Sequence, residues 1–268
     1  MLELTILGNG PVCPNPGGAS SGYLVKGGDT SVVLDIGPGV VATPEFRKSL
    51  PELSGIVISH LHIDHWLGLV PLSYLLKLSP VTHANTPFKV WTPPDTRTQL
   101  LKFLDELSMG YPLDAYDVEE YTAGTVLCLP GLQIKFQQVQ HFIPTFAMRI
   151  ENDAGSLCYS ADSSLCEPLI SIANESSLFL CEAGDGITSP KNSAQRGHMT
   201  GREAGAAAAN ANVGNLLVTH IWESHDPDQI LTEVAKEFSG ACELAIPGKT
   251  YKVVREQPTA LSHDAPKG

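Results

Sequence analysis

The chain of 268 residues is 43% hydrophobic and carries a formal net charge of −12 at pH 7, with histidine counted as neutral. A chain of this length can bury one large core, which predicts a single domain over 1–256 and a flexible tail over 257–268. The acidic surface repels polyanions and so argues against a broad nucleic-acid interface, whereas a small anionic substrate is compatible with it.

Cysteine usage and the distribution of apolar residues bear on the cellular compartment. The six cysteines stand singly, without a CxxC pair or the density of a disulfide scaffold, which favours reduced thiols. The first residues lack the apolar run of a signal peptide, and no stretch of about eighteen apolar residues predicts a membrane span. We therefore expect a cytoplasmic protein without a membrane partner.

The first part of the chain predicts a sheet that leads into a helix. Four short β-rich runs end at turn residues: 2–7, 22–26, 31–36 and 56–59. Helical spacing begins after His65 and ends at Pro80. The apolar stripe of this helix is expected to consist of Leu67, Val70, Tyr74 and Leu78.

Residues 80–124 are the least regular segment, with prolines and acidic residues around a second predicted helix over 98–109. A segment of this kind could cap a pocket or contact a partner subunit, and it could carry substrate specificity.

Strands and helices alternate from residue 125 onward. Strands are predicted at 125–129, 133–140, 145–150, 156–159, 178–181 and 215–219. Three helix starts follow from capping patterns, namely Ser164 with Glu167, Thr200 with Glu203, and Asp226 with Pro227. Two mixed sheets with helices outside both would bury this order of elements, which predicts an α/β fold with four αββα layers.

The segment HLHIDH at 60–65 places four ligand-type side chains within six residues, at a predicted strand-to-helix turn. Such crowding needs a cation, and the pattern rarely arises by chance. His60 and His62 alternate in an extended loop and can share one metal, whereas Asp64 and His65 face a second position. Imidazole nitrogens with one carboxylate favour Zn²⁺, with Mn²⁺ or Fe²⁺ as alternatives.

The segment ISHLHIDHWLG resembles the signature motif of the metallo-β-lactamase superfamily, and further motifs of that family follow in order. By this resemblance, Asp35 in LDIGPG supports the metal-binding loop. His141 in VQH is the third ligand of the first metal, Asp162 in YSADS bridges both metals, and His220 in VTHIW completes the second site. These last three residues each follow an apolar predicted strand, so they can meet at one edge of the sheets. The resemblance implies a hydrolase of that fold with two divalent cations, and it suggests a homodimer.

The reaction depends on residues outside the ligand set, because the superfamily hydrolyses several classes of ester and amide. Glu182 in LFLCEAG and His198 in RGHMTGREAG resemble motifs of the ribonuclease Z branch and its small bacterial cyclic-nucleotide phosphodiesterase relatives. In those enzymes this histidine contacts the scissile phosphate, and an imidazole held by a carboxylate can protonate a leaving alkoxide. We therefore expect cleavage of a small phosphodiester, such as a cyclic nucleotide, by a metal-bound hydroxide that Asp64 could orient.

Transfer RNA is not the expected substrate. The tRNA-gripping arm of ribonuclease Z lies between the motifs that His141 and Asp162 represent, and here 162 − 141 = 21 positions leave room only for two strands and a turn. The acidic net charge also disfavours RNA. Lys191 and Arg196 could still contact a small phosphate.

Two alternative functions stay open. One is a carboxylic ester, lactone or thioester hydrolase with the same metals, in which His198 only lines the pocket. The other is a metal-containing protein without hydrolytic activity. Among the three tryptophans, Trp222 is the best candidate for the pocket because it lies two residues after His220, although packing is the default role for each.

Overall fold

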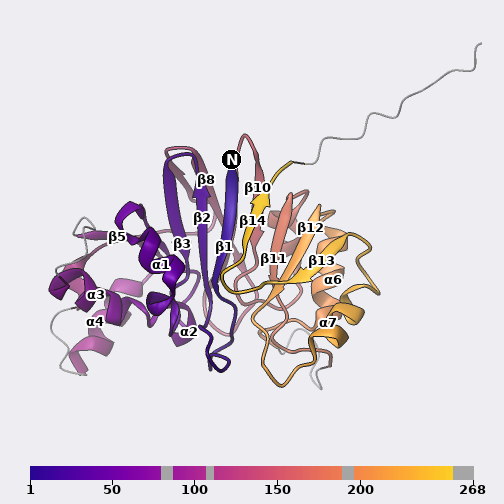
Figure 1. Cartoon of the computed structure of the whole chain (residues 1–268), viewed down its shortest axis with the longest axis horizontal. Helices are drawn as coiled ribbons and strands as arrows, with labels where there is room; N and C mark the ends of the chain where they lie inside the picture. The colour runs from indigo at the N-terminus through magenta and orange to yellow at the C-terminus, as the bar shows by residue number, and fades with distance from the viewer. Residues whose placement is uncertain (80–86, 107–111, 189–195, 256–268) are drawn as a thin grey trace, which may run out of the picture.

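The computed structural model describes residues 1–79, 87–106, 112–188 and 196–255, which form two seven-stranded sheets packed face to face. Helices cover the outer face of each sheet, on the left and right of Figure 1. The predicted αββα sandwich of two mixed sheets is therefore confirmed. Among the described helices, none is long and apolar enough to cross a bilayer. The predicted tail lies outside the described residues, and the single-domain boundary stays a prediction.

The first sheet has the strand order β14-β1-β2-β3-β4-β5-β6. Strands β14 to β3 pair in antiparallel fashion, and β3 to β6 pair in parallel. The bounds are β1 (Leu2–Gly8), β2 (Gly22–Gly27), β3 (Thr30–Leu34), β4 (Gly55–Val57), β5 (Phe88–Thr92), β6 (Tyr116–Glu120) and β14 (Thr250–Val253). All residues of β3 and β4 are buried, as is usual for parallel strands that are covered on both faces.

The second sheet has the order β13-β12-β11-β10-β9-β8-β7, antiparallel from β7 to β10 and parallel from β10 to β13. The bounds are β7 (Val126–Leu129), β8 (Leu132–Val139), β9 (Thr145–Asn152), β10 (Gly155–Tyr159), β11 (Leu178–Glu182), β12 (Asn215–Thr219) and β13 (Ala241–Leu244). Buried and partly exposed residues alternate along most of β8, because one face of this strand meets the core.

The helices form two groups, one for each sheet. The group on the first sheet consists of α1 (Pro44–Ser49), α2 (Ile63–Trp66), α3 (Leu69–Leu78) and α4 (Thr96–Glu106), with short 3₁₀ turns at Val40–Ala42, Leu50–Glu52 and Pro112–Ala115. The group on the second sheet consists of α5 (Glu167–Ala173), α6 (Gly201–Asn210) and α7 (Pro227–Val234). Thr200 and Glu203 form the predicted capping box of α6, and Asp226 caps α7 as expected.

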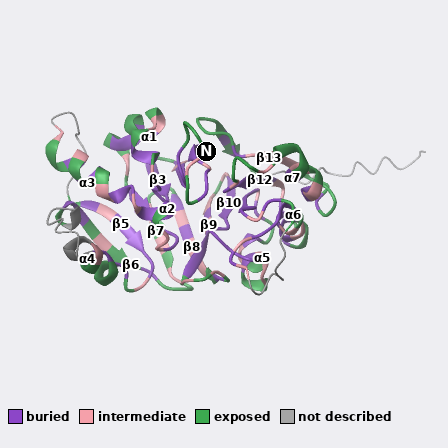
Figure 2. Cartoon of the chain, turned by 90° about the horizontal axis from the view of Figure 1, so that it is seen from below, coloured by how far each residue is buried: buried purple, intermediate pink, exposed green. Residues whose placement is uncertain are grey.

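Three layers of buried side chains hold the sandwich together. The central layer lies between the sheets and includes Tyr23, Phe136 and Met148. The two outer layers lie between each sheet and its helices, around Phe46 and Phe179 respectively. Figure 2 shows the buried strands in purple between helices whose outer faces are green. Because burial of one large apolar side chain contributes about 1.5–3 kcal/mol, these layers stabilise the packing of the sheets on each other and on their helices.

Two sequence predictions for the first half of the chain are wrong: the irregular character of residues 80–124 and the buried face of the helix after His65. Residues 80–124 are not merely irregular, because β5 and β6 lie there and extend the first sheet. The stripe predicted for the helix after His65 is also wrong, since Tyr74 and Leu78 are 36% and 74% exposed. The buried face of α3 consists of Leu69, Leu72, Ser73 and Leu76. Apolar residues occur on every side of this helix, so their spacing does not single out the face that meets the sheet.

The predicted capping role of Ser164 is wrong as well. Helix α5 begins at Glu167, and Cys166 precedes it without a side-chain cap. The Ser164 hydroxyl instead donates to the carbonyl oxygen of Arg196, near the start of α6. This contact joins the loop between β10 and α5 to the segment before α6, and both lie near the candidate site.

Candidate metal centre

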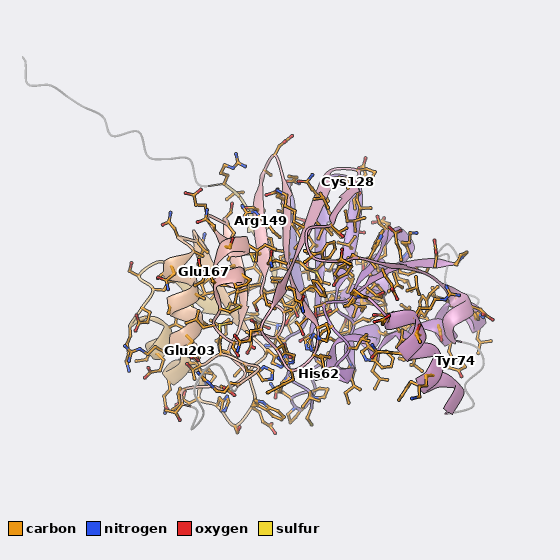
Figure 3. The ribbon with its side chains drawn as sticks, turned by 180° about the vertical axis from the view of Figure 1, so that it is seen from behind. His62, Tyr74, Cys128, Arg149, Glu167 and Glu203 are labelled. Carbon is orange, nitrogen blue, oxygen red and sulfur yellow. The ribbon has the colours of Figure 1, made fainter. Side chains whose placement is uncertain are left out.

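The HLHIDH segment runs from the loop after β4 into helix α2, with His62 at the N-cap of that helix. His60 and His65 are fully buried, and Asp64 is only 2% exposed. Gly37 permits a close approach of the loop after β3, because a Cβ atom there would overlap the carbonyl oxygen of Asp64. Figure 3 shows His62 at the lower edge of the molecule, between the two groups of helices.

Three strands end in a residue or turn with a positive φ angle, and each of these ends lies near the HLHIDH segment. Asp35 directly follows β3 and has φ 57°, Ala161 precedes Asp162 after β10 and has φ 52°, and His220 directly follows β12 with φ 60°. Residues other than glycine adopt this left-handed conformation rarely, and it is often found at functional sites. The turns bring Asp162 and His220 together with the HLHIDH segment.

The first cluster consists of His60, His62, His141 and Asp162. The Nδ1 atom of His62 lies 3.2 Å from His60 Nε2 and 2.9 Å from His141 Nε2. Asp162 Oδ2 lies 3.7 Å from His60 Nε2 and 4.0 Å from His141 Nε2. Ligands in a tetrahedral zinc site are about 3.3 Å apart, because each lies about 2.0 Å from the metal. The donor set therefore fits a single cation.

The second cluster consists of Asp64, His65, Asp162 and His220. His65 Nε2 lies 3.3 Å from Asp64 Oδ2 and 3.3 Å from Asp162 Oδ2, and it is a buried nitrogen without a hydrogen bond. His220 Nε2 lies 3.4 Å from Asp162 Oδ2 and 3.9 Å from Asp64 Oδ2. Because Asp162 Oδ2 belongs to both clusters, it can bridge two cations.

Hydrogen bonds to the outer ring nitrogens orient four of these histidines. The Nδ1 atom of His65 donates to Asp35 at 2.7 Å, and that of His141 donates to the Gly197 carbonyl at 2.7 Å. His60 Nδ1 lies 3.0 Å from Ser59 Oγ, and His220 Nδ1 lies 3.3 Å from Ser21 Oγ. In each case Nε2 is left to face the centre, as is usual for metal ligands with an outer hydrogen-bond partner.

The protonation behaviour of the rings also fits a cation. Burial lowers the pKa of His60 well below its ordinary value and lowers the pKa of His141 to about 4, so both rings are neutral at pH 7. Burial acts in the same direction on His65, but Asp162, Asp35 and Asp64 outweigh it and raise the pKa of His65 well above its ordinary value. A divalent cation between these carboxylates can take the place of that proton.

A second acid and histidine pair lies beside the clusters. Glu182, at the end of β11, is 1% exposed, and its carboxylate accepts the backbone N–H groups of Ser163 at 2.8 Å and Gly184 at 2.7 Å. The same carboxylate accepts Nδ1–H of His198 at 3.0 Å, and His198 Nδ1 lies 3.9 Å from Asp162. The structure therefore brings Glu182 and His198 to the edge of the metal cluster, with His198 Nε2 available to a ligand.

Arg196 forms two ion pairs. Its guanidinium pairs with Asp185 at 3.2 Å and with Glu203, the residue that completes the capping box of Thr200 in α6. Arg196 lines a separate hollow and is not among the described residues that line the pocket at the metal clusters, and its contact with a substrate phosphate stays a prediction. Lys191 lies outside the described residues.

A pocket of about 450 Å³ opens over the two clusters. Its polar lining includes His62, Asp64, Asp162, His198 and His220. Trp222, the best candidate among the three tryptophans, lines it, whereas Trp66 and Trp91 are buried in the cores. Val12, Ile63 and Phe142 also line the pocket, although no motif in the sequence predicts this. For Phe142, its position directly after His141 is the available signal.

Comparison with known proteins agrees with this geometry. Residues 30–221 match the family model of the beta-lactamase superfamily domain. An uncharacterized protein of Mycobacterium leprae is 31% identical over 94% of this chain and 89% of that protein. A ribonuclease Z of Mycobacterium bovis is 29% identical over 91% of this chain and 95% of that enzyme.

A solved structure extends the likeness to three dimensions. The crystal structure of YhfI, a metallo-beta-lactamase fold protein from Bacillus subtilis, matches with a TM-score of 0.82 at 25% identity, covering 94% of this chain and 100% of that chain. The curated name of the same relative is probable metallo-hydrolase. With the family model matching most of its length, this chain belongs to the beta-lactamase superfamily.

Proposed function

We propose that this metallo-hydrolase cleaves a small phosphodiester, such as a cyclic nucleotide, at the pocket over the two clusters. The observation that carries the proposal is the Glu182–His198 hydrogen bond of 3.0 Å beside Asp162. A thioester needs no such pair, because a thiolate leaves without a proton, whereas a sugar alkoxide is a poor leaving group until it is protonated.

Two divalent cations, with Zn²⁺ favoured by the donor set, would be held by His60, His62, His141 and Asp162 and by Asp64, His65, Asp162 and His220. When bound, such a pair of cations acidifies water and neutralises charge on the substrate phosphate. Asp64 lines the pocket and belongs to the second cluster, so its second oxygen can accept a hydrogen bond from an attacking water.

His198 would supply the proton for the leaving oxygen. Its Nδ1 atom is held by Glu182, so Nε2 is the nitrogen that can reach a substrate in the pocket. The backbone N–H groups of Ser163 and Gly184 keep the Glu182 carboxylate in place. With its position fixed by these two bonds, the Glu182 carboxylate can hold the His198 ring in one orientation.

The short segment between His141 and Asp162 supports a small substrate over a folded RNA. The paired strands β9 and β10 occupy this segment, so no arm for a folded RNA extends from it. The net charge of −12 supports a small substrate further, because RNA binding depends on many phosphate contacts from basic residues. A homodimer and a cytoplasmic location stay predictions.

The test compares phosphodiesters with other esters. Protein reconstituted with Zn²⁺ should hydrolyse bis(4-nitrophenyl) phosphate and cyclic AMP faster than lactones and acyl thioesters. The variant His198→Ala should lower kcat on cyclic AMP, whose leaving group is an alkoxide, by about 100-fold or more with metal content retained. It should lower kcat on bis(4-nitrophenyl) phosphate less, because nitrophenolate leaves without a proton. His225→Ala is the matched control, since His225 is the one described histidine outside the clusters and the Glu182 pair.

Ester or thioester turnover without diester turnover would contradict the proposal and favour the first alternative. Two bound metals without turnover of any substrate would favour a protein that binds metal and does not hydrolyse.

A further inference from the structure

Four large apolar side chains are exposed around the pocket. Val12, Ile63, Phe142 and Trp222 are 45%, 47%, 63% and 37% exposed, and all four line the pocket. They come from four different parts of the chain: the β1–β2 loop, the start of α2, the β8–β9 loop and the segment after β12. We call this set the apolar rim.

The apolar rim has the character of a ligand-binding surface. Single exposed apolar residues are common, but several that gather at one hollow mark a binding surface, because each loses contact with water only when a ligand covers it. The polar wall of the same pocket contains the candidate metal ligands and His198. A ligand that fills the pocket therefore has an anionic end and an apolar end.

The local packing holds Phe142 at the rim. Its ring lies 5.1 Å from the His141 ring and 6.3 Å from the His198 ring, measured between centroids. Gly197 makes room for this arrangement, because a Cβ atom there would overlap both the Phe142 ring and His141 Nδ1. An aromatic face beside His141 and His198 suits a flat partner, since aromatic rings stack well on one another.

We propose that the apolar rim binds a planar aromatic group on the phosphodiester, and that Phe142 and Trp222 are specificity-determining residues that stack against it. This inference rests on the proposed function of the pocket. A nucleobase and a simple aryl ester share the required chemistry, and the substrate pairs below distinguish these two sources.

The first pair is cyclic AMP and the 3′,5′-cyclic phosphate of 1-deoxyribofuranose, which has the same reacting ring without a base. The second pair is phenyl 4-nitrophenyl phosphate and ethyl 4-nitrophenyl phosphate, which release the same product. In at least one pair, the wild-type protein should prefer the aromatic member by about tenfold in kcat/KM. Preference in the first pair alone identifies a nucleobase, and preference in the second alone identifies another aryl group.

The variants Phe142→Ala and Trp222→Ala should shrink this preference mainly through KM, whereas Trp222→Phe should keep most of it. Val126→Ala removes an exposed apolar side chain that does not line the pocket, so its preference should equal that of the wild type. Because each variant is compared with itself on two substrates, partial loss of folded protein does not alter the ratio.

Equal kcat/KM within both pairs, or an unchanged preference in both alanine variants, would overturn the inference while leaving diester cleavage intact. No turnover of any of the four diesters would overturn the proposed function itself, and the inference with it.

Discussion

The hydroxyl of Tyr159 donates to Asp35 Oδ2 at 2.7 Å and so joins the end of β10 in the second sheet to the end of β3 in the first. The same carboxylate accepts the backbone N–H and hydroxyl of Ser59, both at 2.7 Å, and Nδ1–H of His65 at 2.7 Å. Asp35 and Tyr159 are almost fully buried. One carboxylate therefore ties both sheets to a ring of the second candidate metal cluster.

The variant Tyr159→Phe tests this tie. Loss of a hydrogen bond to a buried carboxylate should lower the free energy of unfolding by about 1.5–3 kcal/mol, measured by denaturant titration of the metal-free protein. Tyr251→Phe is the control, since the Tyr251 hydroxyl makes only long hydrogen bonds of 3.3 and 3.4 Å. Equal effects of the two substitutions would show that Tyr159 does not support Asp35.

The two clusters should lose metal independently. His62→Ala removes a donor from the first cluster only, and His65→Ala removes one from the second only. Each variant should bind about one divalent ion fewer than the wild type, measured by elemental analysis after dialysis, while Asp162→Asn should weaken both sites. Loss of all metal from either histidine variant would contradict two separable sites bridged by Asp162.

The pH dependence of cyclic AMP cleavage should follow His198, because the alkoxide that leaves needs its proton. Burial lowers the pKa of His198, but the Glu182 carboxylate outweighs it and the pKa rises to about 10. A raised pKa keeps the proton on the imidazole at neutral pH, and activity is lost as pH rises through that pKa. Cations bound at Asp162 would lower the pKa somewhat, which moves the alkaline limb toward neutrality.

Glu182→Gln removes the charge that raises the pKa of His198, so the alkaline limb of the kcat/KM profile should move to lower pH by one unit or more. Glu167→Gln, at the exposed start of α5, should leave the limb where it is. Identical alkaline limbs for wild type and Glu182→Gln would show that His198 does not donate the proton.

The sequence predicts the residues of the two metal clusters better than the surface around them. The crowded ligand-type side chains of the HLHIDH segment can be recognised directly, whereas His141, Asp162 and His220 are assigned through their resemblance to metallo-β-lactamase motifs, with which their positions after apolar strands agree. The fold class followed from the order of strands and helices. The structure brings together all the residues that were assigned to the centre.

Other features depend on the three-dimensional arrangement and leave no local pattern. Ser21 and Tyr159 meet the site through contacts between residues more than a hundred positions apart in the chain. The Phe142 ring packs against Gly197, which is distant in the sequence, so closely that a Cβ atom there would overlap it. Strand β6 carries acidic residues, and the edge position that tolerates them becomes visible only in the assembled sheet.

The most direct test of the account is metal content measured together with diester cleavage. Metal-free, untagged protein is titrated with Zn²⁺, and the bound ions are counted by elemental analysis while cleavage of bis(4-nitrophenyl) phosphate is followed. A two-metal centre predicts two ions per chain, with activity that appears as the sites fill. Protein that binds no ions after reconstitution, or that cleaves the diester equally well without them, would contradict it.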